Sequence, residues 1–207
     1  MDDEARRVVR AGYEQVAAAY DARRPRDGAD VAWLDDVIAA VGRGGRVLDA
    51  GCGAGEPVAT RLLAAGLAVV GVDCAAAPLR LARRLTGPLT LVQGDLAALP
   101  LPDASVDGVV SFYAVIHVPR DDHRRVFAEL HRVLRPDGVA VLCLGARDLP
   151  ADRDDTSWLG APMFWSHFDA ETNGALLEDA GLAVERAARV PDPMGHGEHL
   201  FVTARRR

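Results

Sequence analysis

A glycine-rich loop that follows a short apolar strand constrains the fold of this chain most. Residues 46–50 have the apolar character of a buried strand, and the loop 51–55, with the sequence Gly-Cys-Gly-Ala-Gly, follows directly. Residues 56–65 then favour a helix. Glycines in such a loop let the backbone come close to a ligand, with the helix N-terminus facing it. This order of elements predicts a nucleotide-binding α/β fold.

The rest of the chain alternates strands and helices around this loop. Apolar runs predict strands at 67–72, 89–92, 106–112 and 139–144, and helical patterns predict helices at 76–85 and 120–134. Such alternation is typical of a parallel sheet with helices on both faces. After a helix expected at 169–180, two strands follow without a helix between them, at 182–190 and 200–204. These two strands should therefore pair antiparallel.

The N-terminal 45 residues are expected to contain two helices, separated by a break at residues 25–28. Residues 2–20 form an amphipathic pattern with apolar side chains four, three and four positions apart, and residues 33–41 form a second helix that ends at Gly42. The segment 147–168 is first polar and then aromatic, and we expect it to be irregular.

Composition excludes several classes of protein. The chain has 207 residues, 49 % of them hydrophobic, which fits one globular domain. A net charge of −6 argues against sequence-independent nucleic-acid binding. No apolar run approaches the roughly 18 residues of a membrane span, and the start is acidic, unlike a secretory signal, so we expect a cytoplasmic protein. The three cysteines, Cys52, Cys74 and Cys143, lack metal-ligand spacing, so we expect no metal site.

Two carboxylates flank the glycine loop, Asp49 before it and Glu56 after it. Glu56 stands where the dinucleotide fingerprint requires glycine. Carboxylates repel a pyrophosphate but attract a sulfonium and an ammonium, and S-adenosylmethionine carries both cations and no phosphate. The loop therefore favours S-adenosylmethionine over NAD. The alternative is that Asp49 only orders the loop and Glu56 only favours the start of the helix.

Two further acids end the next strands of the predicted sheet. Asp73 lies 22 positions after Gly51, close to the roughly 20 residues at which an acid binds ribose hydroxyls in this class of fold. Asp95 follows the third strand and can accept from an adenine amine, while Leu96 can pack on the ring. Acids at the carboxyl ends of consecutive strands should face one crevice.

The motifs together resemble a known family. Residues 47–55 resemble motif I of the class I S-adenosylmethionine-dependent methyltransferases, and residues 71–73 and 94–96 are similar to the second and third motifs of that family. Residues 132–138 resemble the turn before the fifth strand, with Asp137 where glycine is more usual. The resemblance covers roughly residues 8–145 and continues more weakly to the end.

The resemblance implies a Rossmann-like, mostly parallel seven-stranded sheet with helices on both faces and the last strand antiparallel. It also implies an N-terminal helical lid over residues 1–45, a donor-binding core over 46–207, and an acceptor-pocket insertion near 147–168. The methionine end of S-adenosylmethionine would lie at the loop, the ribose on Asp73, the adenine near Asp95, and the lid tyrosines over the donor. The implied donor-binding set is Tyr13, Tyr20, Asp49, Gly51, Cys52, Gly53, Asp73, Cys74, Asp95, Leu96 and Phe112. Cys52 is expected to pack within the loop.

Two histidines are candidates for a general base. His117 follows the fourth strand, near the expected position of the donor methyl, and His167 lies in the aromatic segment that would build the acceptor pocket. His117 could instead only order its loop, and the aromatic segment could be core beneath a long loop. The proposed substrate-binding residues are Tyr113, Trp158, Met163 and Trp165.

The other histidines are given structural roles. His123 and His131 are expected on a solvated helix face, and His196 and His199 at a hairpin turn, since no third metal ligand stands out beside them.

The leading hypothesis is methyl transfer to an O- or N-nucleophile of a small molecule. A nucleic-acid methyltransferase should carry an Asn/Asp-Pro-Pro-aromatic tetrad after the fourth strand, where this chain has Ser-Phe-Tyr-Ala at 111–114. A dehydrogenase is disfavoured by Glu56. A donor-binding protein without transfer activity stays open, and the sequence names neither the acceptor nor the oligomeric state.

Overall fold

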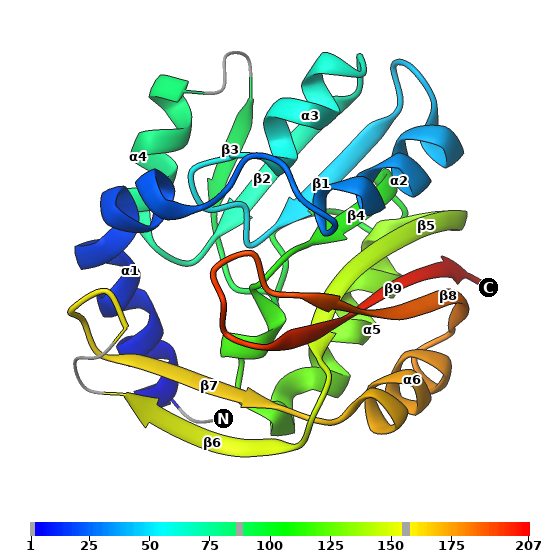
Figure 1. Ribbon diagram of the computed structural model, residues 1–207. Helices are drawn as coiled ribbons and strands as arrows, with labels where there is room; N and C mark the ends of the chain where they lie inside the picture. The colour runs from blue at the N-terminus through cyan, green and yellow to red at the C-terminus, as the bar shows by residue number, and fades with distance from the viewer. Residues whose placement is uncertain (1–2, 86–88, 155–157) are drawn as a thin grey trace.

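Seven strands form the central sheet of the computed structural model, which describes residues 3–85, 89–154 and 158–207. The strand order is β3-β2-β1-β4-β5-β9-β8 (Figure 1). Neighbouring strands from β3 to β5 are parallel, and β9 is antiparallel to both β5 and β8. The predicted sheet, with its antiparallel last strand, is confirmed. The bounds are β1 Arg46–Ala50, β2 Ala68–Asp73, β3 Thr90–Gln93, β4 Val106–Ser111, β5 Leu134–Gly145, β8 Leu182–Pro191 and β9 Glu198–Arg206.

Helices cover both faces of the sheet. α5 and α6 contribute to the hydrophobic cluster on one face, and α2 and α3 to the cluster on the other. Side chains alternate along β1, so that Val47 packs into one cluster and Leu48 into the other. The helices after the N-terminal one are α2 Leu34–Val41, α3 Val58–Ala64, α4 Ala76–Leu85, α5 His123–Val133 and α6 Ala170–Asp179, with short 3-10 helices η1 Val31–Trp33, η2 Val115–His117 and η3 Arg120–Asp122.

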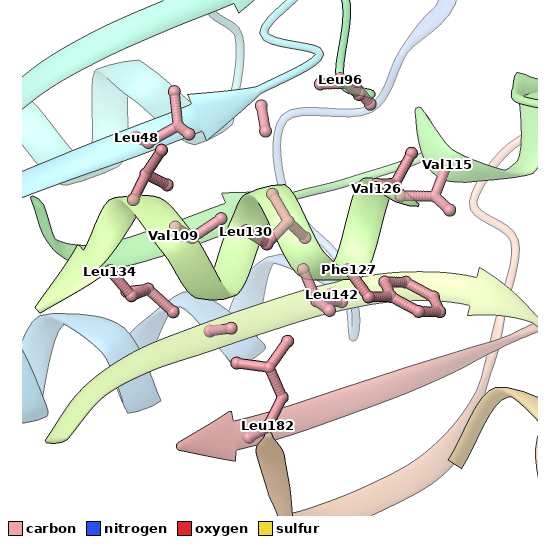
Figure 2. Packing of buried hydrophobic residues seen from close by; sticks show 14 of the residues in the cluster. Leu48, Leu96, Val109, Val115, Val126, Phe127, Leu130, Leu134, Leu142 and Leu182 are labelled. Atoms are coloured by element: carbon pink, nitrogen blue, oxygen red, sulfur yellow. The ribbon is translucent and has the colours of Figure 1, made fainter. Parts of the chain in front are cut away.

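The face under α5 forms the larger core. Figure 2 shows Phe127 and Leu130 of α5 directed at Val109 of β4 and Leu142 of β5, and all four side chains are fully buried. Burying each such side chain contributes roughly 1.5–3 kcal/mol. This core holds the carboxyl ends of the central strands, where the candidate site lies, in fixed positions.

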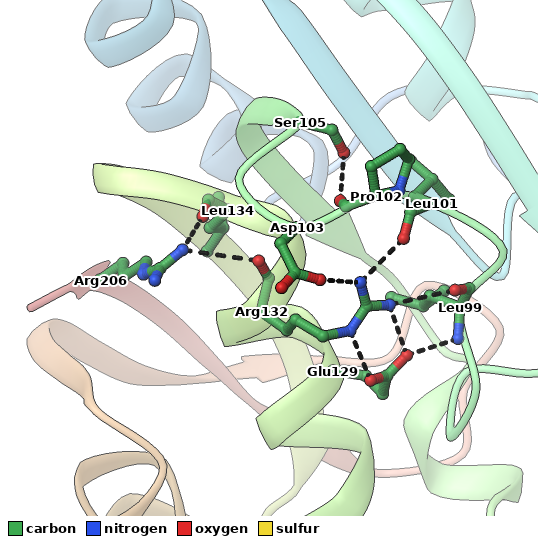
Figure 3. Close-up of polar contacts among 9 residues, drawn as sticks. All are labelled: Leu99, Leu101, Pro102, Asp103, Ser105, Glu129, Arg132, Leu134 and Arg206. Carbon is green, nitrogen blue, oxygen red and sulfur yellow. Dashed lines mark hydrogen bonds and ion pairs between the residues drawn. The ribbon is translucent and has the colours of Figure 1, made fainter.

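The loop between β3 and β4 is attached to α5 through one arginine (Figure 3). The Arg132 guanidinium donates to both carboxylate oxygens of Glu129, to Asp103, and to the backbone carbonyls of Leu99 and Leu101, at distances of 2.7–3.1 Å. Glu129 also accepts from the Leu99 amide at 2.7 Å. These contacts of Arg132 and Glu129 order the loop between β3 and β4, whose first residues were predicted to contact adenine.

The N-terminal segment differs in part from the predicted lid. α1 (Asp3–Arg23) lies between α4 and the strand β7 (Figure 1), whereas α2 packs on β4 and β5 as part of the sheet's helical layer. Since α2 belongs to the layer that covers the sheet, the prediction of a lid applies to α1 alone. Within the described ranges, no helix combines the length and apolar character needed to cross a bilayer.

The segment 147–168, of which residues 155–157 lie outside the described residues, contains two strands where an irregular segment was expected. β6 (Leu149–Asp154) and β7 (Met163–His167) form an antiparallel two-stranded sheet beside α1 and η2. Four of the five β7 residues are buried. Buried backbone polar groups need partners, and pairing with β6 supplies them.

Candidate active site

A cavity lies beneath α1 at the carboxyl ends of β1, β2 and β4. Its lining includes the whole predicted donor-binding set: Tyr13, Tyr20, Asp49, Gly51, Cys52, Gly53, Asp73, Cys74, Asp95, Leu96 and Phe112. Gly51 has a φ of +82°, and a Cβ atom there would lie 2.2 Å from the Cβ of Ala114. Only glycine fits this position, and its bare backbone forms part of the floor of the cavity.

Asp73 holds the glycine loop in place. Its carboxylate accepts from the Gly53 amide and from the Ala75 amide, each at 2.9 Å. Burial raises the pKa of Asp73, and these backbone hydrogen bonds oppose the rise. Each carboxylate oxygen has a second lone pair, so the same group can order the loop and accept from a ribose.

Asp49 is a buried acid with an unsatisfied oxygen. Asp49 is only 2 % exposed, and its Oδ2 atom has no hydrogen-bond partner among the residues that the structure describes. Burial, and then the nearby Asp73 charge, raise the pKa of Asp49 to about 8. A carboxyl group in such surroundings fits a ligand that brings positive charge, because a cation favours the ionised form. The site therefore fits the ammonium and sulfonium of S-adenosylmethionine.

α1 is fixed to the predicted adenine end of the cavity by ion pairs. Arg6 pairs with Asp95, and also with Asp122 at 2.9 Å. Glu14 accepts from the Ala76 amide at 2.5 Å, at the start of α4. An adenine amine bound at Asp95 would share that carboxylate with Arg6, which couples the lid helix to the donor.

A second cavity lies on the other side of α1's aromatic residues, beside the β6–β7 hairpin. Tyr113, Trp158, Trp165, His117 and His167, all predicted for acceptor binding or catalysis, line it. Five residues line both cavities, namely Tyr13, Tyr20, Arg24, Tyr113 and His117. The cavities therefore meet along one shared wall.

Met163 does not line either cavity. Its side chain is fully buried, and its methyl end lies against Gly12 of α1, where an added Cβ would be 2.8 Å from it. Met163 thus packs the hairpin onto α1 behind the cavity wall, because side chains alternate along β7.

His117 lies on the shared wall in a defined tautomer. Its Nδ1 is 2.8 Å from the Phe164 carbonyl oxygen, which only accepts, so Nδ1 carries the hydrogen. Burial lowers the pKa of His117 to about 4, and the imidazole is neutral at pH 7. Nε2 therefore presents a lone pair, to which the Tyr13 hydroxyl donates at 3.1 Å. His117 thus offers a proton acceptor where the two cavities meet.

The aromatic rings form one continuous wall of the second cavity. The Trp158 ring lies 5.4 Å from Tyr13, 5.7 Å from Tyr20 and 6.0 Å from Trp165, measured between centroids. His117 stands 5.6 Å from Trp165. Such a wall offers an apolar surface against which a ring could pack.

Sequence reasoning missed a buried ion pair on the shared wall. Arg24 pairs with Asp30 and lies over the Tyr113 ring at 5.0 Å, and the Tyr113 hydroxyl donates to Asp30 at 3.2 Å. Arg24 and Asp30 are only 5 % and 1 % exposed. No motif marks this pair, because it forms only when η1 packs beside the end of α1.

Two of the remaining histidines, His123 and His199, are more buried than the sequence suggested. His123 is 1 % exposed and donates from Nε2 to the Val118 carbonyl at 3.1 Å, so it does not belong to a solvated face. The hairpin turn before β9 is confirmed, but His199 at its end is buried and lines the second cavity. In the described part of the chain, no three His, Cys, Asp or Glu side chains are grouped to hold a metal.

Cys52 packs inside the loop. A Cβ atom on Gly71 would lie 2.8 Å from its sulfur, and burial raises the pKa of the thiol well above the usual value. An un-ionised, buried thiol is a poor nucleophile.

Comparison with known proteins agrees with the fold and with the acid-lined crevice. The family model described as a methyltransferase domain matches residues 48–142. A probable S-adenosylmethionine-dependent methyltransferase of Mycolicibacterium smegmatis is 36 % identical over 139 residues, which is 67 % of this chain and 52 % of that protein. An uncharacterized methyltransferase of Synechocystis is 31 % identical over 156 residues, covering 71 % of each chain.

Among solved structures, the Burkholderia thailandensis 1,6-didemethyltoxoflavin-N1-methyltransferase superposes with a TM-score of 0.76. It is 26 % identical, and the match covers 100 % of this chain and 90 % of that one. That structure holds S-adenosylhomocysteine and 1,6-didemethyltoxoflavin.

The Rossmann-like fold, the acid-lined first cavity and the similarity to known methyltransferases together define the class of this protein. It is a protein that binds S-adenosylmethionine, a nucleoside with a positively charged sulfur. The chain belongs to the S-adenosylmethionine-dependent methyltransferases. It spans about half the length of the first curated relatives that it matches, 52 % and 45 %.

Proposed function

We propose that the protein transfers a methyl group from S-adenosylmethionine in the first cavity to a nitrogen or oxygen of a flat small molecule in the second. The observation that supports this most is the shared wall, at which Tyr13 and His117 contact both cavities. Residues that line both cavities show that the two cavities adjoin, so a donor in one and an acceptor in the other would come closest to each other there. Alignment of this kind supplies much of the rate of a displacement reaction.

The residues of the first cavity fit the donor. Asp49 brings negative charge beside the predicted sulfonium and ammonium, Asp73 accepts from the ribose, and Asp95 accepts from the adenine amine. The bound donor supplies an electrophilic methyl carbon whose leaving group is a neutral thioether. The chain has only to orient it and to exclude water.

The residues of the shared wall remove a proton from the acceptor. When a nitrogen or oxygen lone pair forms its bond to the methyl carbon, the electrons of the broken carbon–sulfur bond stay on sulfur. The proton that the acceptor loses needs a base, and we assign this role to His117, whose Nε2 accepts from Tyr13 where the two cavities adjoin. Tyr13 exchanges its hydrogen bond to His117 for one to the acceptor.

The aromatic wall supports a flat acceptor, and the Burkholderia neighbour supports a nitrogen heterocycle. That enzyme is named for methylation at N1 of 1,6-didemethyltoxoflavin and binds this compound. The three cysteines of this chain are free, which agrees with action in a reducing compartment such as the cytoplasm.

The experiment is incubation with S-adenosylmethionine carrying a trideuterated methyl group and a panel of planar N- and O-nucleophiles, followed by mass spectrometry. We expect one class of compound to gain a trideuteromethyl group in place of hydrogen. Donor binding without a labelled product would indicate a binding protein, and label on an added DNA or RNA oligonucleotide would indicate a nucleic-acid methyltransferase. The matched control is Trp165→Ala, which should lose labelling but keep donor affinity, because Trp165 lines only the second cavity.

A further inference from the structure

Three buried histidines from different elements line the second cavity: His117 of η2, His167 of β7 and His199 of β9. We propose that each presents an unprotonated ring nitrogen to the acceptor, which must therefore carry N–H or O–H groups along one edge of a planar ring. The inference rests on the proposed function and narrows it to one chemical class of acceptor.

The protonation of His167 follows from its hydrogen bond. Nδ1 lies 2.7 Å from the Arg147 carbonyl oxygen, so Nδ1 carries the hydrogen and Nε2 the lone pair, as in His117. The ring is held in place by Gly145, where an added Cβ would come within 2.1 Å of Nδ1. Burial lowers the pKa of His167, which keeps the imidazole neutral.

His199 has its ring nitrogens in the opposite roles to those of His117 and His167, and it too has a nitrogen that can accept a hydrogen bond. Its Nε2 lies 3.4 Å from Asp192 Oδ2, which only accepts, so Nε2 carries a hydrogen. Its Nδ1 is buried and has no hydrogen-bond partner in the described part of the chain, so no acceptor is present there for a hydrogen and we assign the lone pair to Nδ1. The ring also packs edge-on against Tyr113, with centroids 5.2 Å apart. An acceptor with a suitably placed donor would satisfy the unpaired nitrogen.

Lone pairs that line a cavity select for ligands with hydrogen-bond donors. A buried polar group left without a partner costs about 1–3 kcal/mol, and sites built to bind an N–H or O–H strongly reject analogues that lack it. The rings of Trp158 and Trp165, which lie beside His117 in the wall of this cavity, supply an apolar contact for the ligand. A planar ring with two or more N–H or O–H groups on one side fits both features.

The protonation states are tested without the substrate. Protein labelled with 15N-histidine and saturated with S-adenosylhomocysteine is studied at pH 7 by two-bond proton–nitrogen correlation, and single His→Gln variants assign the signals. We expect Nδ1–H tautomers at His117 and His167 and an Nε2–H tautomer at His199. A cationic imidazole or a reversed tautomer at any of the three would overturn the inference.

The ligand class is tested with matched probes. Lumazine, with two N–H groups, is compared with 1,3-dimethyllumazine, and catechol with its dimethyl ether, by quenching of tryptophan fluorescence in the S-adenosylhomocysteine complex. The unmethylated member of at least one pair should bind at least about tenfold more tightly. His167→Phe and His199→Phe should each reduce that preference while S-adenosylhomocysteine affinity stays unchanged.

The two proposals fail in different ways. If no unmethylated probe binds more tightly than its methylated partner, or if the labelled product has no N–H or O–H edge, this inference is wrong and the methyltransferase function stands. Loss of S-adenosylhomocysteine binding by the parent protein would contradict the proposed function instead.

Discussion

The hydroxyl oxygen of Tyr13 lies 3.1 Å from His117 Nε2 and joins α1 to η2, where the two cavities meet. The bond exists because the Phe164 carbonyl fixes the hydrogen of His117 on the other ring nitrogen. α1 thus brings a hydrogen-bond donor to the lone pair of a histidine that lines both cavities. If α1 acts as the predicted lid, this contact would couple its closure to the group that we propose takes the acceptor's proton.

We predict that His117→Gln lowers single-turnover methyl transfer by about 10²–10⁴, the usual effect of losing a general base. Tyr13→Phe, which keeps the ring but frees Nε2, should have a smaller effect. Donor affinity, measured by calorimetry, should stay within a few fold in His117→Gln. A turnover within a few fold of the parent would mean that alignment alone, or an already ionised acceptor, accounts for the reaction.

We predict that Asp73→Ala reduces donor affinity at least about tenfold. Charge-assisted hydrogen bonds contribute roughly 1.5–3 kcal/mol each, and about 1.4 kcal/mol corresponds to tenfold in affinity. The variant also frees the Gly53 amide, so circular dichroism must show an intact fold. Asp35→Asn, on an exposed acid that pairs with Arg61, is the matched control and should bind the donor normally. Equal affinity in parent and Asp73→Ala would place the ribose elsewhere.

Donor binding should release a proton from Asp49. Its pKa is about 8 in the free protein, so the group is largely protonated at pH 7. A bound cation favours the carboxylate, and donor affinity should therefore rise with pH toward 8, by at most about tenfold per unit. Calorimetry in two buffers of different ionisation enthalpy measures the proton count. Asp49→Asn should lack this proton, while titration of the donor's own amino group is the same in both proteins. An identical proton count in the two would contradict the prediction.

The protein should lose stability in mild acid. His117 and His123 have folded-state pKa values of about 4, lowered by burial, below the ordinary 6.5 of the unfolded chain. Between these values the unfolded state binds more protons, so stability falls as pH drops from about 6.5 toward 4, by at most about 1.4 kcal/mol per unit for each group. Urea unfolding at pH 7 and pH 5 measures this loss. His123→Gln should show a shallower pH dependence, and an unchanged dependence would mean that His123 does not titrate in this range.

Most of the fold, and the gathering of the candidate donor-binding residues around one cavity, could be predicted, because local sequence patterns determine them. The glycine loop, Asp73 and Asp95 follow consecutive apolar strands, and parallel strands bring their carboxyl ends to one edge of the sheet. The features that could not be predicted from the sequence depend on contacts between distant segments of the chain. The 147–168 hairpin has no clean alternation, and its pairing is favoured by burial against α1. His199 looks like a turn residue until β9 pairs with β5 and places it beside Tyr113.

The most direct test of the account is a crystal structure of the protein with S-adenosylhomocysteine. We expect the ligand to fill the first cavity, with its ribose hydroxyls within hydrogen-bond distance of Asp73 and its sulfur directed at the wall formed by Tyr13 and His117. A ligand bound in the second cavity, or one whose sulfur points away from that wall, would contradict it.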